Sequence, residues 1–345
     1  MIPPDRRGLP RRALAWLVNK AKRVPQGLRS GDDLPPELRH AMWNSKVMGS
    51  ALARQAYQTG LAGPGAPPVE APVQAGLGGR LCRQEDIEAA WLRHWCGRTG
   101  MVPLYHRKVW EECFILQALW EQGMLAPGRR GLGFAVGREP LPSLLAAIGA
   151  EVVATDLPPR DRRARRWRQA AQHAAEAEAL RWPNIVAQDV FEARVAIRPA
   201  DMAAIPADLR GFDFLWSGCA LEHLGTLGRG ADFVLRAMEC LRPGGVAVHT
   251  TEFNVAAQGP TTARGPTVLY QRRHVESLGE RLAAAGHRLL PVDFSPGEGV
   301  LDRFVDLPPF SMPDGSLPVP DAPHLKKSAR QYVATSIGLI VVAAG

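Results

Sequence analysis

From Gly131 onward, the sequence alternates between short apolar runs and longer stretches in which apolar residues recur at helical spacing. Five short runs read as strands, at residues 131–136, 151–155, 184–187, 212–216 and 246–251. Helical stretches lie between them at 140–148, 160–180 and 232–241, and a helix at 274–285 precedes two further strands at 287–294 and 334–344. Such alternation predicts an α/β fold with a mostly parallel sheet.

The rest of the chain divides into segments of different composition. Residues 59–80 are dominated by Gly, Ala and Pro and predict a linker after a basic N-terminal extension, 1–58. Two lead-in helices are expected within 81–128, at 84–96 and 108–122, and the α/β domain then spans 129–345. Its Pro-rich stretch, 295–333, has the length of a substrate-binding loop.

The positive charge of the chain is confined to two patches. The 345 residues carry a net charge of +8, but residues 1–55 hold 11 Lys/Arg against 4 acids, and residues 160–168 hold six Arg against one Asp. The remainder is net negative, which disfavours a nucleic-acid-binding surface spread over the fold. We therefore expect no nucleic-acid partner, and at most weak peripheral contact of the basic N-terminus with an anionic surface.

Cysteine usage and hydropathy bear on the location of the protein. The five cysteines form no CxxC pair and have no zinc-ligand spacing, so we expect neither a disulfide framework nor a metal site. No apolar run approaches the ~20 residues of a transmembrane helix. A cytoplasmic protein is the expectation, and the sequence leaves its oligomeric state open.

The strongest site signal is a turn of small residues after the first strand. Residues 133–139 read Gly-Phe-Ala-Val-Gly-Arg-Glu, a helix follows, and the next strand ends at Asp156. Such a turn lets a ligand approach backbone N–H groups, and an acid at the neighbouring strand end can accept hydrogen bonds from ribose hydroxyls. Together they predict a nucleoside-containing cofactor.

At this point residues 129–345 resemble the class I S-adenosylmethionine-dependent methyltransferases. Residues 240–246, Cys-Leu-Arg-Pro-Gly-Gly-Val, are similar to the family's Pro-Gly-Gly turn into the fifth strand, and Leu221-Glu222-His223 to the turn after its fourth strand. In the glycine loop only Gly137 falls on a family glycine, while Ala135 and Glu139 replace the others. The resemblance implies a Rossmann-like, doubly wound, seven-stranded and mostly parallel sheet with an antiparallel last strand, preceded by an N-terminal helical extension.

The resemblance also implies S-adenosyl-L-methionine as the cofactor. Asp156 would hold the ribose, Asp189 the adenine, and the 133–137 turn the methionine end. The expected cofactor-binding residues are Gly133, Phe134, Ala135, Gly137, Glu139, Asp156, Leu157, Gln188, Asp189, Val190, Leu221 and Glu222.

Side chains near the ends of the later strands are candidates for chemistry on the acceptor. His223 or Glu252 could act as general base, since a hydroxyl acceptor needs a base with a suitable pKa. Asn254, together with His106 and Arg107 before the domain, could contact substrate. The alternative for His223 is that it only orders its turn together with Glu222, and the alternative for the basic residues is a solvated helix surface.

The sequence therefore predicts methyl transfer to a small molecule or saccharide, at a hydroxyl oxygen. An NAD(P)-dependent reductase is one rival, although none of the four tyrosines has a lysine four residues later. A non-catalytic relative is the other, suggested by Ala135 and Glu139 in the loop.

Overall fold

The computed structural model describes residues 35–158, 160–165, 173, 177–310, 319 and 321–345. Its sheet is built on five parallel strands in the order β4-β3-β2-β5-β6, followed by β11 antiparallel to β6. Their bounds are β2 Arg130–Phe134, β3 Glu151–Asp156, β4 Val195–Pro199, β5 Phe212–Gly218, β6 Leu241–Asn254 and β11 Tyr332–Val342. The α/β fold with an antiparallel last strand is confirmed.

Short strands extend this sheet beyond the seven that were expected. They are β1 Gly79–Leu81, β7 Arg288–Leu289, β8 Val292–Asp293, β9 Val305–Asp306 and β10 Lys326–Ala329. β7 and β1 pair antiparallel with β11, and β8 continues beyond β1, so the sheet reaches eleven strands among the described residues. Two of them, β9 and β10, come from the predicted substrate loop.

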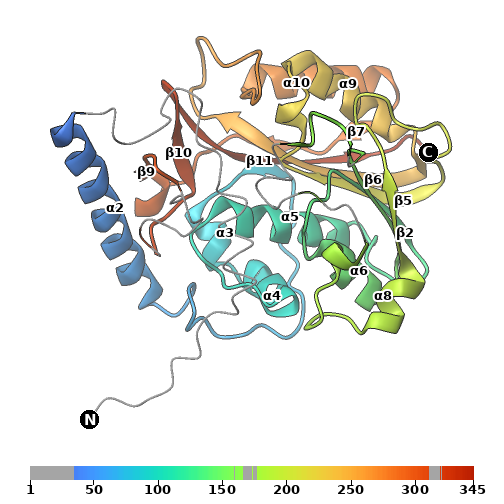
Figure 1. The fold of residues 1–345 in the computed structure, drawn as a ribbon, viewed down its shortest axis with the longest axis horizontal. Coiled ribbons are helices and arrows are strands. Elements are labelled where there is room, and N and C mark those ends of the chain that lie inside the picture. The colour runs from blue at the N-terminus through green and yellow to red at the C-terminus, as the bar shows by residue number, and fades with distance from the viewer. Residues whose placement is uncertain (1–34, 159, 166–172, 174–176, 311–318, 320) are drawn as a thin grey trace.

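Helices cover both faces of the sheet, as Figure 1 shows. One face carries α3 Gln84–Glu88, α4 Ala90–Thr99, α5 Arg107–Glu121, α6 Leu141–Ile148 and α8 Gln188–Arg194, and the other carries α9 Leu227–Met238 and α10 Arg272–Ala284. Side chains alternate between faces along a strand. Phe214 and Trp216 accordingly pack in the core under α4, α5 and α6, while Leu215 packs in the core under α9 and α10.

The predicted third strand is wrong. Residues 184–187 form a turn, α8 follows immediately, and the strand lies at Val195–Pro199. The apolar side chains of the misread run belong to helix packing, since Val186 is buried in the core that contains α6. Residues 166–172 and 174–176 of the predicted helix 160–180 lie outside the described residues. Of the described part, 160–164 are not helical and the last four residues form the 3-10 turn η2 Ala177–Leu180.

The helix before the domain, α2 Pro36–Tyr57, lies at one side of the molecule beside β9 (Figure 1). It is held there by a buried ion pair from Lys46 to Asp306. Across the part of the chain that the structure describes, no helix is long and apolar enough to cross a membrane.

Candidate active site

A cavity of about 450 Å³ opens at the carboxyl ends of β2, β3, β4 and β5. Its walls are the turn after β2, the tip of β3, the residues that follow β4, and the residues that follow β5 up to the 3-10 turn η3 Leu221–His223. Parallel strands bring their carboxyl ends to one sheet edge, which is where open α/β sheets bind ligands.

The turn after β2 has the backbone of a glycine loop. Ala135 and Gly137 both adopt positive φ, 51° and 56°. Val136 N–H donates to the Thr155 carbonyl at 3.1 Å, which ties the turn to β3. Left-handed backbone favours glycine, so the alanine occupies a strained position that the fold imposes.

Asp156 lies at the tip of β3 and lines the cavity, as predicted from its position. Its Oδ1 accepts a hydrogen bond from Leu157 N–H at 2.8 Å. This backbone contact orients the carboxylate at the tip of the strand.

The acid segment after the third strand is corrected by the structure. Gln188, Asp189 and Val190 lie in the first turn of α8, and none of them lines the cavity. The residues that follow the actual strand β4 line it instead, namely Ala200, Asp201, Met202 and Ala203. The signal available in the sequence was an acid four positions after the run Val-Ala-Ile at 195–197.

Asp201 is held firmly in this wall. Its Oδ1 accepts from Ala203 N–H at 2.9 Å, and its Oδ2 accepts from Arg163 Nη2 at 2.8 Å. Both contacts fix the carboxylate at the cavity edge, two residues after the end of β4, which pairs with β3.

The other predicted residues divide between cavity wall and core. Ala135, Gly137, Glu139, Leu157, Arg107 and His223 line the cavity, whereas Gly133, Phe134, Leu221, Glu222, Glu252, Asn254 and His106 do not. Phe134 packs edge to face on Phe233, and a Cβ on Gly133 would lie 2.4 Å from the Trp216 ring. These two β2 residues therefore pack in the core next to the turn and do not contact the cavity.

His223 is oriented by its neighbours. Its Nδ1–H donates to the Pro266 carbonyl at 2.7 Å, and its Nε2 lies 3.5 Å from Glu222 Oε1. Glu222 is fully buried and its Oε2 accepts from Thr251 Oγ1 at 2.9 Å. A carbonyl on one ring nitrogen and a carboxylate near the other suit an imidazole that gains and loses a proton.

Glu252 is locked in a buried ionic network. Its Oε1 accepts from Arg107 Nη2 and from Lys327 Nζ, each at 2.7 Å. Burial alone would raise the pKa of this carboxyl, but the charges of Arg107 and Lys327 outweigh it and hold that pKa below its usual range. Glu252 is thus a weak base placed to fix Arg107, contrary to the catalytic role expected from its position.

Arg107 is the other centre of this network. Besides Glu252, its guanidinium donates to Glu111 Oε1 at 3.1 Å and to Ser336 Oγ at 2.9 Å. Lys327, from β10, lies beside it, and burial lowers the pKa of the Lys327 ammonium to about 8. Sequence reasoning missed Glu111, which lies one helical turn after Arg107 in α5. It also missed Ser336 and Lys327, which only the folded sheet brings to the start of α5.

The two other predicted substrate residues have structural partners. The Asn254 amide side chain accepts from Ala256 N–H at 3.0 Å and donates to Thr261 Oγ1 at 3.3 Å, which shapes the loop after β6. His106 caps α5 by accepting from Lys108 N–H at 3.1 Å, and its ring stacks on His324. Burial lowers the pKa of both histidines well below the usual range.

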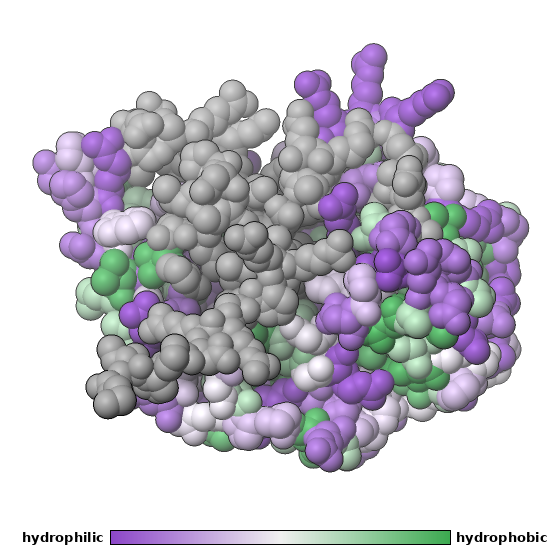
Figure 2. Space-filling model, turned by 60° about the horizontal axis from the view of Figure 1, so that its bottom comes forward, coloured by the Kyte–Doolittle hydropathy of each residue, from purple (hydrophilic) through white to green (hydrophobic). Residues whose placement is uncertain are grey.

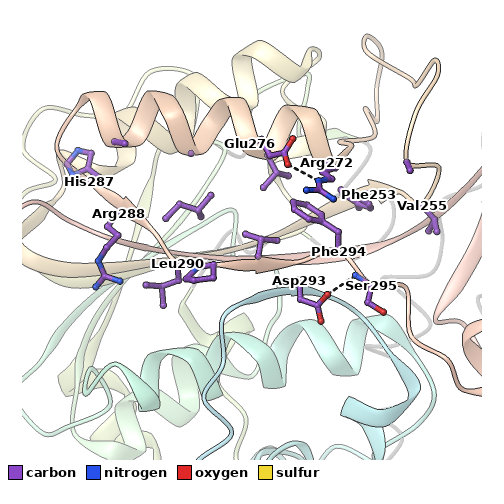
Figure 3. Close-up of a pocket in the computed structure, with 17 residues that line it drawn as sticks. Phe253, Val255, Arg272, Glu276, His287, Arg288, Leu290, Asp293, Phe294 and Ser295 are labelled. Atoms are coloured by element: carbon purple, nitrogen blue, oxygen red, sulfur yellow. Dashed lines mark hydrogen bonds and ion pairs between the residues drawn. The ribbon is translucent and has the colours of Figure 1, made fainter.

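A second cavity, of about 830 Å³, lies between α10 and the strands β7 and β8 (Figure 3). Leu290 and Phe294 contribute to its apolar lining, and the Arg272–Glu276 pair stands on its helical side. None of the residues predicted for chemistry lines it. The sheet-edge cavity is therefore the candidate active site.

The described residues hold neither a clustered set of metal ligands nor a disulfide. In the described ranges, no group of three or more His, Cys, Asp or Glu side chains is placed to hold a metal ion. All five cysteines are free and buried, and Cys96 and Cys113 lie with their sulfurs 3.7 Å apart as thiols.

Comparison with known proteins gives structural likenesses only. No family model and no curated protein sequence matches the chain. A phosphoethanolamine N-methyltransferase 2 from Haemonchus contortus is 16% identical with a TM-score of 0.40, over 67% of this chain and 52% of its own. The present chain thus spans about half the length of that protein.

Two further solved structures are similar at the same level. A S-adenosylmethionine-dependent methyltransferase from Clostridium acetobutylicum is 12% identical with a TM-score of 0.37, over 68% of this chain and 91% of its own. Magnesium protoporphyrin IX methyltransferase from Synechocystis is also 12% identical with a TM-score of 0.40, over 76% and 87%. Likenesses this distant say nothing about activity. On the strand order, with β11 inserted antiparallel between β6 and β7, the chain has the Rossmann-like fold of class I S-adenosylmethionine-dependent methyltransferases.

Proposed function

We propose that the protein transfers a methyl group from S-adenosyl-L-methionine to a hydroxyl oxygen of a small molecule or saccharide. The observation that carries the proposal is the placement of two carboxylates, Asp156 and Asp201, on neighbouring strand ends beside a left-handed turn at Ala135 and Gly137. A nucleoside presents the matching groups, namely ribose hydroxyls and an exocyclic amine.

The residues of the cavity fit this cofactor in order along its length. Asp156 would accept from the ribose hydroxyls, and Asp201, in place of Asp189, from the adenine amine. The 135–137 turn would lie against the methionine end. Glu139, which is 1% exposed, lines the same cavity and lies against Gly218, since a Cβ there would come within 2.9 Å of its Oε1. We assign its carboxylate to the ammonium group of the cofactor.

The protein's own contribution to chemistry would come from His223. The cofactor supplies an electrophilic methyl group on a sulfonium, so the acceptor needs positioning and removal of one proton. With Nδ1–H donated to Pro266, Nε2 is the ring atom that takes the hydroxyl proton, and Glu222 then stabilises the imidazolium. Arg107, fixed by Glu252 and Glu111, would shape the wall beside it.

Free buried thiols suit a reducing compartment. The neighbouring sulfurs of Cys96 and Cys113 support a cytoplasmic location, which we include in the proposal.

Turnover is tested by mass spectrometry of a cell extract incubated with the protein and a methyl donor whose transferable methyl group is deuterated. We expect a labelled product with the wild type and at least about a hundredfold less with His223→Gln, the loss typical of a missing general base. Unchanged product with His223→Gln would contradict the role of His223. Tight cofactor binding without any labelled product would instead support a non-catalytic relative.

The orientation of the cofactor is tested by comparing two ligands. S-Adenosylhomocysteine carries the amino-acid end, whereas 5′-methylthioadenosine lacks it. Glu139→Gln should weaken the first by about tenfold or more and leave the second unchanged, since only the first offers an ammonium group. Asp156→Asn, the matched control at the ribose, should weaken both equally. Equal losses with Glu139→Gln would refute the assignment of this carboxylate.

A further inference from the structure

Helix α2 is packed with its polar and small residues inward. The side that faces the protein consists of Lys46, Gly49, Ser50 and Ala53. The large apolar side chains point to solvent instead, with exposed fractions of 48% for Leu38, 46% for Trp43, 49% for Val47, 66% for Met48 and 36% for Leu52. Figure 2 shows hydrophobic atoms among hydrophilic ones on the left of the molecule, the side on which α2 lies. An ordinary surface helix shows the opposite arrangement.

Specific contacts fix this orientation. Lys46 is 2% exposed and its Nζ donates to Asp306 Oδ1 at 2.6 Å, while Asp306 Oδ2 accepts from His324 Nδ1 at 2.7 Å. Gly49 lies against the Phe304 ring, where a Cβ would come within 2.4 Å of a ring carbon. If the helix rotated to bury its exposed apolar side chains, the ion pair between Lys46 and Asp306 would break. A larger residue than Gly49 would then meet the Phe304 ring. The apolar side is therefore held outward by the fold.

The charge around this helix indicates what covers it. Residues 1–35 hold 8 Lys/Arg against 3 acids, so the segment that precedes α2 in the sequence is strongly basic. The helix itself holds 3 Lys/Arg and 1 Glu, and two of these cations, Lys46 and Arg54, form ion pairs within the protein. A second copy of the chain would bring its own basic segment close to this one, and the two like charges would repel. An anionic bilayer is attracted instead, and each basic residue near its surface raises the affinity roughly fivefold.

We propose that α2 is an interfacial helix that docks on anionic phospholipid surfaces. Its outward side chains would enter the boundary between headgroups and acyl chains, and the basic residues before and along it would contact the headgroups. A helix with several exposed large apolar side chains, among them a Trp, and a preceding basic segment shares these features with membrane-surface helices. This inference is independent of the proposed methyl transfer.

The test is vesicle co-sedimentation of the full chain. Vesicles of phosphatidylcholine alone are compared with vesicles that also contain phosphatidylserine, at low and high salt. We expect binding only to the anionic vesicles, weakened by salt. The variant Leu38→Ser/Trp43→Ser/Met48→Ser should bind at least about tenfold more weakly, because three apolar side chains no longer enter the boundary region. Val73→Ser, an exposed apolar residue outside the helix, is the matched control and should bind like the wild type.

Three results would overturn the proposal. One is absence of wild-type binding to the anionic vesicles, and another is equal binding by the triple variant. The third is a dimer of the wild type in solution that the triple variant loses, which would assign the apolar side to a second copy. Circular dichroism of the triple variant checks its fold, and the single variant Trp43→Ser provides a milder change at an exposed position.

Discussion

Separate replacement of Asp201 and Asp189 tests which of the two carboxylates binds the adenine of the cofactor. The structure favours Asp201, and the sequence alone favoured Asp189. Asp201 lines the cavity after β4, whereas Asp189 is exposed in the first turn of α8. We choose asparagine at both positions because it keeps the size of the side chain. In Asp201→Asn the amide oxygen can still accept from Ala203 N–H, so the local turn is retained.

The magnitude follows from the hydrogen bond that is exchanged. A hydrogen bond to a charged group contributes about 1.5–3 kcal/mol, which corresponds to roughly 10- to 150-fold in affinity. With Ala203 on one oxygen, the asparagine would turn its amide toward Arg163 and the adenine amine. The ion pair with Arg163 would be lost, and donor would face donor at the adenine. We therefore expect Asp201→Asn to weaken S-adenosylhomocysteine binding by at least about tenfold, and Asp189→Asn to change it less than about twofold.

Calorimetric titration measures the affinity of both variants for S-adenosylhomocysteine. A second ligand shows whether the side chain at 201 accepts or donates a hydrogen bond at the base. S-Inosylhomocysteine carries a carbonyl where adenine has its amine. The wild type should prefer the adenosyl ligand, and Asp201→Asn should reduce or reverse this preference, since its amide can donate to the carbonyl. A large loss with Asp189→Asn and none with Asp201→Asn would refute the reasoning.

Three other perturbations test individual parts of the structure. Ala135→Gly should leave stability unchanged or raise it by up to about 1 kcal/mol in urea denaturation, because relief of a positive φ offsets glycine's entropy; a clear loss would contradict the strain. Arg107→Met should destabilise by about 1.5–3 kcal/mol, since Glu111 and Glu252 lose the cation they share but keep Lys108 and Lys327; a loss below about 1 kcal/mol would argue against the buried network. Burial lowers the pKa of His249 to about 3, whereas in the unfolded state it is about 6.5. Between pH 7 and pH 5 only the unfolded state therefore takes up a proton at this residue. The free energy of unfolding should fall by about 2 kcal/mol over this range. This part of the drop should be missing in His249→Gln, and identical pH profiles would show that the imidazole protonates within the fold.

Features that depend on local sequence could be predicted. The turn after β2 and Asp156 follow from one strand, one turn and the next strand, so counting along the chain placed both at the cavity. β4 was missed because it is a five-residue edge strand that ends in Pro199 and is largely half-exposed, which gives weak periodicity. Because the strand was placed at 184–187, the predicted acid was Asp189, which does not line the cavity, whereas Asp201 does.

Features that depend on long-range pairing could not be predicted. Lys46 and Asp306 are 260 positions apart, and two partners of Arg107, Glu252 and Ser336, come from β6 and β11. Sequence patterning indicated that Glu252 would lie at a strand end, but its pairing with two cations, which makes it a weak base, is a property of the folded interior.

The outward direction of the apolar side chains of α2 also depends on a long-range contact. Its composition indicated a basic helical extension, while the inward direction of Lys46 depends on Asp306 in a distant strand. Which side of an amphipathic helix is covered is decided by what it packs against.

The most direct test of the central claim is calorimetric titration of the full chain with S-adenosylhomocysteine and, separately, with a nicotinamide dinucleotide. We predict saturable binding of one S-adenosylhomocysteine per chain, lost or strongly weakened in Asp156→Ala, and no binding of the dinucleotide. Saturable binding of the dinucleotide without binding of S-adenosylhomocysteine would contradict the account and favour a reductase.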